Sequence, residues 1–244
     1  MLRKTGLLLA LLLSTALFAY TPQRNITLQP ITSTANTAAE ILIQKVLDNL
    51  DGMNAKTTIS PKALEMGING FLKLSAKGNV SPDKPLTIID FSLPSSQKRL
   101  WTVDPITGKI LHHTWVAHGR NSGELMAKKF SNIHSSYMSS LGFYRTAETY
   151  SGKHGYSLRL DGIEKGVNDH ARERAIVIHG AEYANPEFIK KYGRLGRSLG
   201  CPALPMNQYK AIIDSIKDDG CLFIYAPNTD YLQASVLIDI DKTS

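Results

Sequence analysis

Two side chains in this sequence, Cys201 and His179, have the chemistry of a nucleophile and its base. Cys201 lies in the glycine-framed stretch Gly196-Arg-Ser-Leu-Gly-Cys-Pro, and His179 lies between the apolar run 175–178 and Gly180. A thiol attacks as the thiolate, so it needs a base or a positive charge nearby, and the base needs an orienting partner. The pattern predicts a cysteine nucleophile with His179 as its base. The alternative is a turn cysteine and a structural histidine.

The residues around Cys201 suit acyl transfer, in which backbone N–H groups must face a developing oxyanion. Glycine at position 200 permits the close approach and unusual backbone angles that such a turn requires. The expected oxyanion donors are the N–H groups of Leu199, Gly200 and Cys201. Ser198 is expected to hydrogen-bond within the loop or to contact substrate. Arg194 or Arg197 is expected to hold a substrate carboxylate through charge-assisted hydrogen bonds.

Hydrophobic periodicity predicts a mainly β domain with a few helices. Helical spacing of apolar residues covers 38–50, 61–72 behind the N-cap Ser60, and 206–217, and a short helix is expected near 187–192. Runs rich in β-forming residues between turn residues predict strands at 86–91, 100–103, 110–117, 156–160, 175–178 and 221–226. Residues 118–155 show no period. Because long irregular segments in compact domains usually carry function, we expect them to form the wall of a cleft.

The N-terminal sequence has the form of a secretory signal peptide. Arg3 and Lys4 precede a 13-residue apolar run, 6–18, which is shorter than the roughly 20 residues that span a membrane. Leu17 stands where a cleavage site after Ala19 usually has a small residue, so an uncleaved signal anchor is the alternative. The segment predicts export.

The net charge indicates which partners suit the protein, and the cysteine content bears on whether it has a disulfide. The net charge of +7 suits an exported protein that meets anionic cell-wall polymers or lipid head groups, and nucleic acid is a less natural partner outside the cytoplasm. The excess of basic residues also serves solubility alone. Cys201 and Cys221 are the two cysteines, and a disulfide between them is one possibility in an oxidising compartment. The alternative is that Cys221 is a free cysteine that serves as a small hydrophobic residue of a buried strand.

Metal and nucleotide chemistry are disfavoured by residue spacing. The seven histidines show no paired ligand spacing, and His-Glu-x-x-His is absent. The glycines of 193–196 do not follow a predicted strand in the order of a nucleotide-binding loop. We therefore expect no cofactor and no metal.

Short motifs in a fixed order extend the pair of His179 and Cys201 into a longer pattern. They include Asp90-Phe-Ser, Val116-Ala-His-Gly119, Phe130-Ser-Asn132, His154-Gly155 and Phe223-Ile-Tyr225. His179-Gly180 followed by Ser198-Leu-Gly-Cys201 resembles the His-Gly…Ser-x-Gly-Cys signature of YkuD-type L,D-transpeptidases, peptidoglycan enzymes with a catalytic cysteine. The whole pattern, over roughly residues 60–226, is similar to the murein L,D-transpeptidase catalytic domain branch of that family.

The resemblance implies a peptidoglycan L,D-transpeptidase, a cysteine-dependent acyltransferase. By its motif, Cys201 would attack the L-centre carbonyl of diaminopimelate in a tetrapeptide stem and release D-alanine. His179 would be the base, oriented by a backbone carbonyl near Gly180. A second stem's amine would resolve the thioester to a 3→3 cross-link, whereas water would make the protein an L,D-carboxypeptidase or amidase. An inert Cys201 would leave a non-catalytic wall-binding module.

Two departures from the family pattern flank the cysteine. Leu199 stands where many members have histidine, and Pro202-Ala203 stands where a polar or basic residue often follows. The resemblance also places His118 and Asn132 near the cleft, where each either orients substrate or stabilises the loop.

The expected fold class is mainly β, an L,D-transpeptidase-like β-sandwich with a few helices. The expected segments are a signal peptide at 1–19, a flexible lead-in at 20–37, an N-terminal helical segment at 38–78, the catalytic domain at 79–230 and a C-terminal tail at 231–244. The expected partners are peptidoglycan stem peptides, with no nucleic acid and no membrane beyond an uncleaved signal anchor. The expected state is a monomer exported to the periplasm or cell-wall surface of a bacterium.

Overall fold

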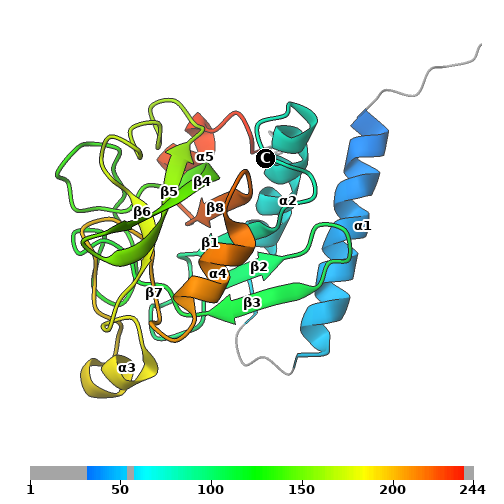
Figure 1. The fold of residues 1–244 in the computed structure, drawn as a ribbon. Coiled ribbons are helices and arrows are strands. Elements are labelled where there is room, and N and C mark those ends of the chain that lie inside the picture. The colour runs from blue at the N-terminus through cyan, green and yellow to red at the C-terminus, as the bar shows by residue number, and fades with distance from the viewer. Residues whose placement is uncertain (1–31, 54–57, 239–244) are drawn as a thin grey trace, which may run out of the picture. The chain divides into compact units, whose positions relative to one another are not determined.

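A computed structural model describes residues 32–53 and 58–238, and the expected signal peptide lies outside them. Figure 1 shows the helices and strands of this part of the chain. The helices are α1 (Thr32–Asp51), α2 (Pro61–Ala76), α3 (Pro186–Tyr192), α4 (Tyr209–Ile216) and α5 (Thr229–Ala234). The strands are β1 (Leu86–Asp90), β2 (Leu100–Val103), β3 (Ile110–Thr114), β4 (Gly142–Gly152), β5 (Gly155–Gly162), β6 (Val177–Gly180), β7 (Ala203–Leu204) and β8 (Cys221–Tyr225). The expectation of a mainly β fold with a few helices is confirmed.

The strands form one mixed sheet in the order β3-β2-β1-β8-β4-β5-β6-β7. The strand β8 lies between β1, to which it is parallel, and β4, to which it is antiparallel. All five of its residues are buried. At the far end of the sheet, β5, β6 and β7 lie side by side (Figure 1). The candidate nucleophile and base are both at this end.

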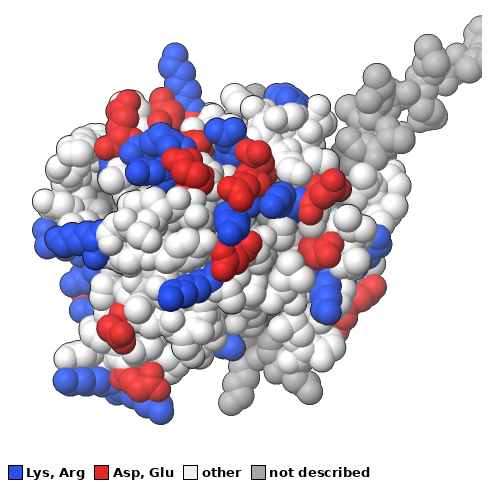
Figure 2. Space-filling model, viewed as in Figure 1, with Lys and Arg blue, Asp and Glu red and all other residues white. Residues whose placement is uncertain are grey.

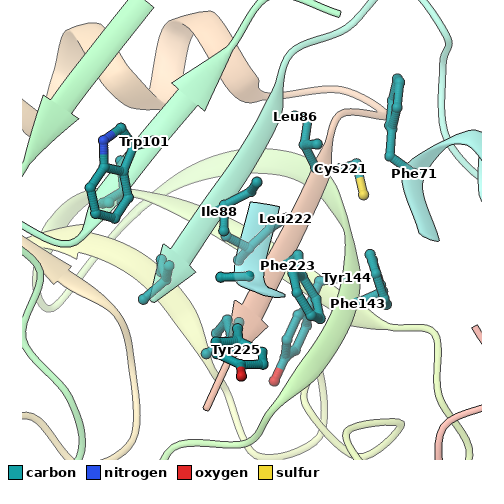
Figure 3. Packing of buried hydrophobic residues seen from close by; sticks show 14 of the residues in the cluster. Phe71, Leu86, Ile88, Trp101, Phe143, Tyr144, Cys221, Leu222, Phe223 and Tyr225 are labelled. Atoms are coloured by element: carbon teal, nitrogen blue, oxygen red, sulfur yellow. The ribbon is translucent and has the colours of Figure 1, made fainter. Parts of the chain in front are cut away.

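The core lies where α2 packs on β1 and the centre of the sheet. The rings of Phe143 and Phe223 stack with centroids 4.2 Å apart, next to Ile88 and Tyr225 (Figure 3). Glycine at position 70 of α2 lets the helix approach, because a Cβ there would lie 2.0 Å from the Phe143 ring. Burial of each such phenylalanine contributes roughly 1.5–3 kcal/mol to stability.

The N-terminus of α2 confirms the start that was expected at Ser60. The Ser60 hydroxyl accepts a hydrogen bond from the N–H of Ala63 at 3.1 Å, and Pro61 occupies the first helical position. The preceding helix α1 packs on α2 and β3, and it begins at Thr32 rather than at Ala38. The stretch 32–37, expected to be part of the flexible lead-in, is therefore helical.

Residues 118–155 are not wholly irregular, because they contain the whole of strand β4. Its pairing with β5 shifts register between Thr146 and Thr149, where a bulge interrupts the ladder. A bulge breaks the alternation of inward and outward side chains, so the sequence showed no period of two here. A second correction concerns β6, which runs to Gly180, so His179 lies inside this strand instead of after it.

The described part of the expected C-terminal tail, residues 231–238, is packed against the core. Tyr231 lies in α5 and donates a hydrogen bond to the buried carboxylate of Glu164 at 3.1 Å, and Ser235 bonds the same carboxylate. Leu237 and Ile238 are also buried. Burial raises the pKa of Glu164, which these donors partly oppose.

Charged residues of both signs are interspersed over the face of the molecule seen in Figure 2. Arg145 and Arg172 share the carboxylate of Asp161, and Arg172 also contacts Glu148. Within residues 32–53 and 58–238, no helix is both long and apolar enough to cross a membrane.

Candidate active site

Cys201 lies on the turn that enters β7, beside the beginning of β6. Its Sγ atom is 3.4 Å from the N–H of Val177 and 3.6 Å from the carbonyl oxygen of Ala175. In the parallel pairing of β6 with β7, His179 lies opposite Ala203. Alternate residues of a strand share a face, so His179 comes from the same side of β6 as Val177. The structure thus brings the two predicted residues to neighbouring positions across one pair of strands.

The imidazole of His179 is held by backbone in the tautomer that a base requires. Its Nδ1 atom is 2.9 Å from the carbonyl oxygen of Gly180. A carbonyl oxygen only accepts hydrogen bonds, so Nδ1 carries the proton and Nε2 keeps its lone pair. Burial lowers the pKa of His179, and the neighbouring His154 lowers it further. At neutral pH the ring is therefore uncharged and able to take a proton.

The thiol of Cys201 is half-buried and carries its proton at rest. Burial raises its pKa, whereas the N–H of Val177 and the charge of Arg174 lower it. A protonated thiol beside a neutral imidazole favours proton transfer to His179 as attack begins, over a preformed thiolate–imidazolium pair.

The turn before Cys201 is closed by two serine hydroxyls. Ser198 donates to the carbonyl oxygen of Cys201 at 2.6 Å and accepts from the N–H of Gly200 at 3.0 Å. Ser139 donates to the carbonyl oxygen of Gly200 at 3.1 Å and accepts from the N–H of Gly119 at 3.0 Å. Ser198 is 5% exposed, so its hydroxyl holds the turn instead of facing substrate.

Only glycine fits position 200. Its φ is +126°, which L side chains rarely adopt, and a Cβ there would lie 2.8 Å from the carbonyl oxygen of Met138. Of the three expected oxyanion donors, the N–H of Gly200 is occupied by Ser198. The N–H groups of Leu199 and Cys201 have no acceptor among the described residues. Leu199 is 58% exposed, so this turn presents an apolar residue to solvent two positions before Cys201.

Residues 55–225 match the family model of the L,D-transpeptidase catalytic domain. The matched range covers more than half of the chain, and it includes Cys201, His179 and the two serines of the turn. The chain belongs to this family. The expected resemblance is thereby confirmed. A search of curated proteins found no match.

Several solved structures of L,D-transpeptidases resemble this chain at low identity. An enzyme from Mycobacterium smegmatis is 13% identical, with 59% of each chain covered and a TM-score of 0.36. One from Mycobacterium tuberculosis H37Rv is 15% identical, with 58% of each chain covered and a TM-score of 0.34. One from Stackebrandtia nassauensis is 14% identical, with 77% of each chain covered and a TM-score of 0.36. The chain spans about 59% of the length of the first of these.

The two arginines expected to bind a substrate carboxylate are already paired in this L,D-transpeptidase domain. Arg194 Nε is 3.0 Å from one carboxylate oxygen of Glu124, and Arg197 contacts the other oxygen. Arg197 also donates to the carbonyl oxygens of Arg120 and Gly123. Both guanidinium groups therefore hold the 120–124 loop, and only part of their hydrogen-bonding capacity remains for a ligand.

His118 and Asn132 both hold loops together. His118 is fully buried, with Nδ1 2.7 Å from Arg99 and Nε2 3.2 Å from the carbonyl oxygen of Gly123. Asn132 donates to Asp169 at 2.7 Å and accepts from the N–H of His170. These contacts favour the loop-stabilising alternative for both residues over contact with substrate.

Three residues near Cys201 or His179 were not predicted as site residues. The ring of exposed His154, in the turn between β4 and β5, stacks on His179 with centroids 4.4 Å apart. Tyr183 lies close enough to Cys201 that a thiolate there adds to the effect of burial, which raises the pKa of Tyr183 to about 12. Arg174 precedes Ala175, whose carbonyl contacts the thiol. Of these three residues, His154 alone had a signal in the sequence, the motif His154-Gly155.

Both cysteines are free, and Cys221 is fully buried in β8. The described residues contain no group of three or more His, Cys, Asp and Glu side chains that could hold a metal ion.

Proposed function

We propose that this protein is a peptidoglycan L,D-transpeptidase in which Cys201 is the nucleophile and His179 the base. The observation that carries the proposal is the contact of the Cys201 thiol with the start of β6, on the strand where His179 is fixed through Nδ1 to the carbonyl of Gly180. The match to the catalytic-domain family over residues 55–225 supports it.

Acylation begins when Nε2 of His179 takes the thiol proton of Cys201. The sulfur attacks the L-centre carbonyl carbon of diaminopimelate in a tetrapeptide stem, and the carbonyl oxygen becomes an oxyanion that the N–H groups of Leu199 and Cys201 can bind. As the oxyanion collapses, the C–N bond to the terminal D-alanine breaks. The leaving amine takes the proton from His179, and a thioester remains on Cys201.

Deacylation repeats the proton transfers with a second stem peptide. The side-chain amine of its diaminopimelate attacks the thioester carbonyl and loses a proton to His179, and the C–S bond breaks. The product is a 3→3 cross-link, and the Cys201 sulfur regains the proton. With water as acceptor, the same steps give a free tripeptide, the outcome of a carboxypeptidase. Peptidoglycan lies outside the cytoplasmic membrane, so the proposal includes export to the periplasm or cell-wall surface.

Intact-mass measurement after incubation with a disaccharide tetrapeptide tests the nucleophile. The expected result is an adduct on the wild-type protein that lacks the mass of D-alanine and is absent from Cys201→Ala. Chromatography of the products then identifies the acceptor. A 3→3 dimer is the product expected of the transferase, whereas a tripeptide alone would show that the protein is a carboxypeptidase instead.

Two histidine variants test the assignment of His179 as the base. His179→Ala should abolish adduct formation while remaining folded, and His170→Ala, at an exposed histidine outside the site, should behave as wild type. Near-wild-type acylation by His179→Ala would contradict the assignment of the base, and an adduct on Cys201→Ala would contradict that of the nucleophile.

A further inference from the structure

Arg174 is a half-buried cation whose hydrogen bonds all go to uncharged groups. Its guanidinium donates to the carbonyl oxygens of Ser131 at 2.7 Å and Met138 at 2.8 Å, and to the hydroxyls of Ser136 and Ser140. Within the described residues, no carboxylate pairs with it. A cation removed from water normally has an acidic partner, so the missing partner points to a role for the charge itself.

The loop 131–140 that Arg174 binds also touches the nucleophile turn. Ser139 donates to the carbonyl oxygen of Gly200, and the carbonyl oxygen of Met138 lies against the Cα of Gly200. In the sequence, Arg174 is followed directly by Ala175, which has a φ of +55°. The carbonyl oxygen of Ala175 accepts a hydrogen bond from the Cys201 thiol. The guanidinium therefore joins the two segments that flank Cys201.

Within the described residues, Arg174 is a cation that acts on the Cys201 thiol and has no carboxylate partner, whereas the exposed Arg120, whose N–H donates to Ser198, lies over the ring of Tyr137. Arg194 and Arg197, on the turn itself, share Glu124. Arg172, two residues earlier, is bound by Asp161 and Glu148.

Within the described residues, Tyr183 is also coupled to Cys201, and its pKa of about 12 keeps it protonated, while His179 on β6 is neutral at neutral pH. An unpaired charge in a partly buried site acts strongly on a thiolate, because little water screens it.

We propose that Arg174 is a positioning residue that sets how readily Cys201 becomes a thiolate, through its unpaired charge, while its hydrogen bonds fix the loop 131–140 against the nucleophile turn. The inference deepens the proposed function, because it concerns the activation of the same nucleophile. It does not depend on the substrate, since the thiolate fraction is a property of the free protein.

The test is the pH dependence of Cys201 alkylation by iodoacetamide, followed by intact mass on the full chain. Cys221 is fully buried, and Cys201→Ala gives the background of any reaction there. In Arg174→Gln the alkylation rate should be about threefold or more below wild type at pH 7.5, and its rise should move to higher pH. Arg172→Gln removes the same charge two residues away, and it should leave the profile unchanged.

Arg174→Lys separates the charge from the hydrogen bonds. It keeps the cation and loses the planar fork that binds loop 131–140, so it should react with iodoacetamide at nearly the wild-type pH and lose thermal stability. Equal profiles for wild type, Arg174→Gln and Arg172→Gln would overturn the proposal. If Arg174→Gln does not fold, an Arg174→Lys profile moved to higher pH overturns it, and an unmoved one supports it. Alkylation needs no peptidoglycan, so these outcomes stand even if the protein has no transpeptidase turnover.

Discussion

The imidazole of His154 stacks on that of His179, with ring centroids 4.4 Å apart and planes inclined by 22°. His154 is exposed at the hairpin between β4 and β5, and His179 is 3% exposed. The hairpin between β4 and β5 thus covers one face of the His179 ring with a second imidazole.

Replacing His154 should change the pH dependence of acylation. Burial and His154 both hold the pKa of His179 below its ordinary value, so the base stays neutral and active as the pH falls through 6.5. His154→Ala removes the cover and the charge, so the pKa of His179 should rise and the acid limb of the acylation rate should move to higher pH. We expect a rate at pH 6 about two- to fivefold below wild type. His154→Phe keeps a stacked ring, and its profile should lie closer to wild type. Profiles that coincide for all three proteins would refute the coupling.

The two glycines Gly200 and Gly166 separate steric clash from backbone strain. Both have positive φ, +126° and +77°, but a Cβ at Gly166 meets nothing within 4 Å. Gly166→Ala should cost about 1 kcal/mol of unfolding free energy. Gly200→Ala should cost at least about 2 kcal/mol more, because its Cβ meets the Met138 carbonyl. Denaturant unfolding measures both, and equal losses would show that the turn relaxes freely around position 200.

Ser198→Ala should loosen the nucleophile turn without removing a reacting group. It leaves the N–H of Gly200 and the carbonyl of Cys201 without their partner, which costs about 1–3 kcal/mol. The acylation rate should fall with the loss of alignment, while iodoacetamide, which needs no alignment, still reaches the thiol. Exposed Ser151→Ala is the control and should match wild type in both measurements. Unchanged acylation by Ser198→Ala would mean that the backbone alone shapes the turn.

Acid should destabilise the protein partly through His118. Its burial, with the charge of Arg99 beside it, lowers the pKa of His118 to about 3. Between pH 6.5 and 3 the unfolded state binds this proton and the folded state does not, so stability is present above 6.5 and is lost as the pH falls. At pH 3.5, protonation of His118 in the unfolded state lowers the free energy of unfolding by roughly 4 kcal/mol relative to neutral pH.

The comparison for this prediction is His118→Gln, whose amide also offers a donor and an acceptor but does not titrate. Urea unfolding of both proteins at pH 7, 5 and 3.5 should show the wild type losing more stability toward acid. Parallel losses would contradict the assigned role of His118.

The sequence was informative where a local pattern determines structure. The cap Ser60-Pro61 placed the start of α2, and the amphipathic spacing around Ile212 and Ile213 placed α4. The motif also pointed to Cys201 and His179, whose roles as nucleophile and base stay a prediction, and the strand that carries His179 was expected two residues too early.

The rest depended on contacts between distant segments. The bulge at Thr146–Thr149 hid β4, and nothing near Arg174 in the sequence indicates that its charge lies beside Cys201. Similarly, no local signal shows that Glu124 would occupy both Arg194 and Arg197. Side-chain pairing of this kind is fixed only when the loops meet in the folded chain.

The central place of β8 has a consequence for how the molecule is made. This strand, Cys221–Tyr225, fills the gap between β1 and β4, so the two parts of the sheet share no ladder until residues 221–225 have been synthesised. Pairings between residues so far apart in sequence form slowly. A nascent or truncated chain that stops before Cys221 has two unpaired strand edges, open to association with other chains. The sheet therefore closes only when β8 is available to pair with both β1 and β4.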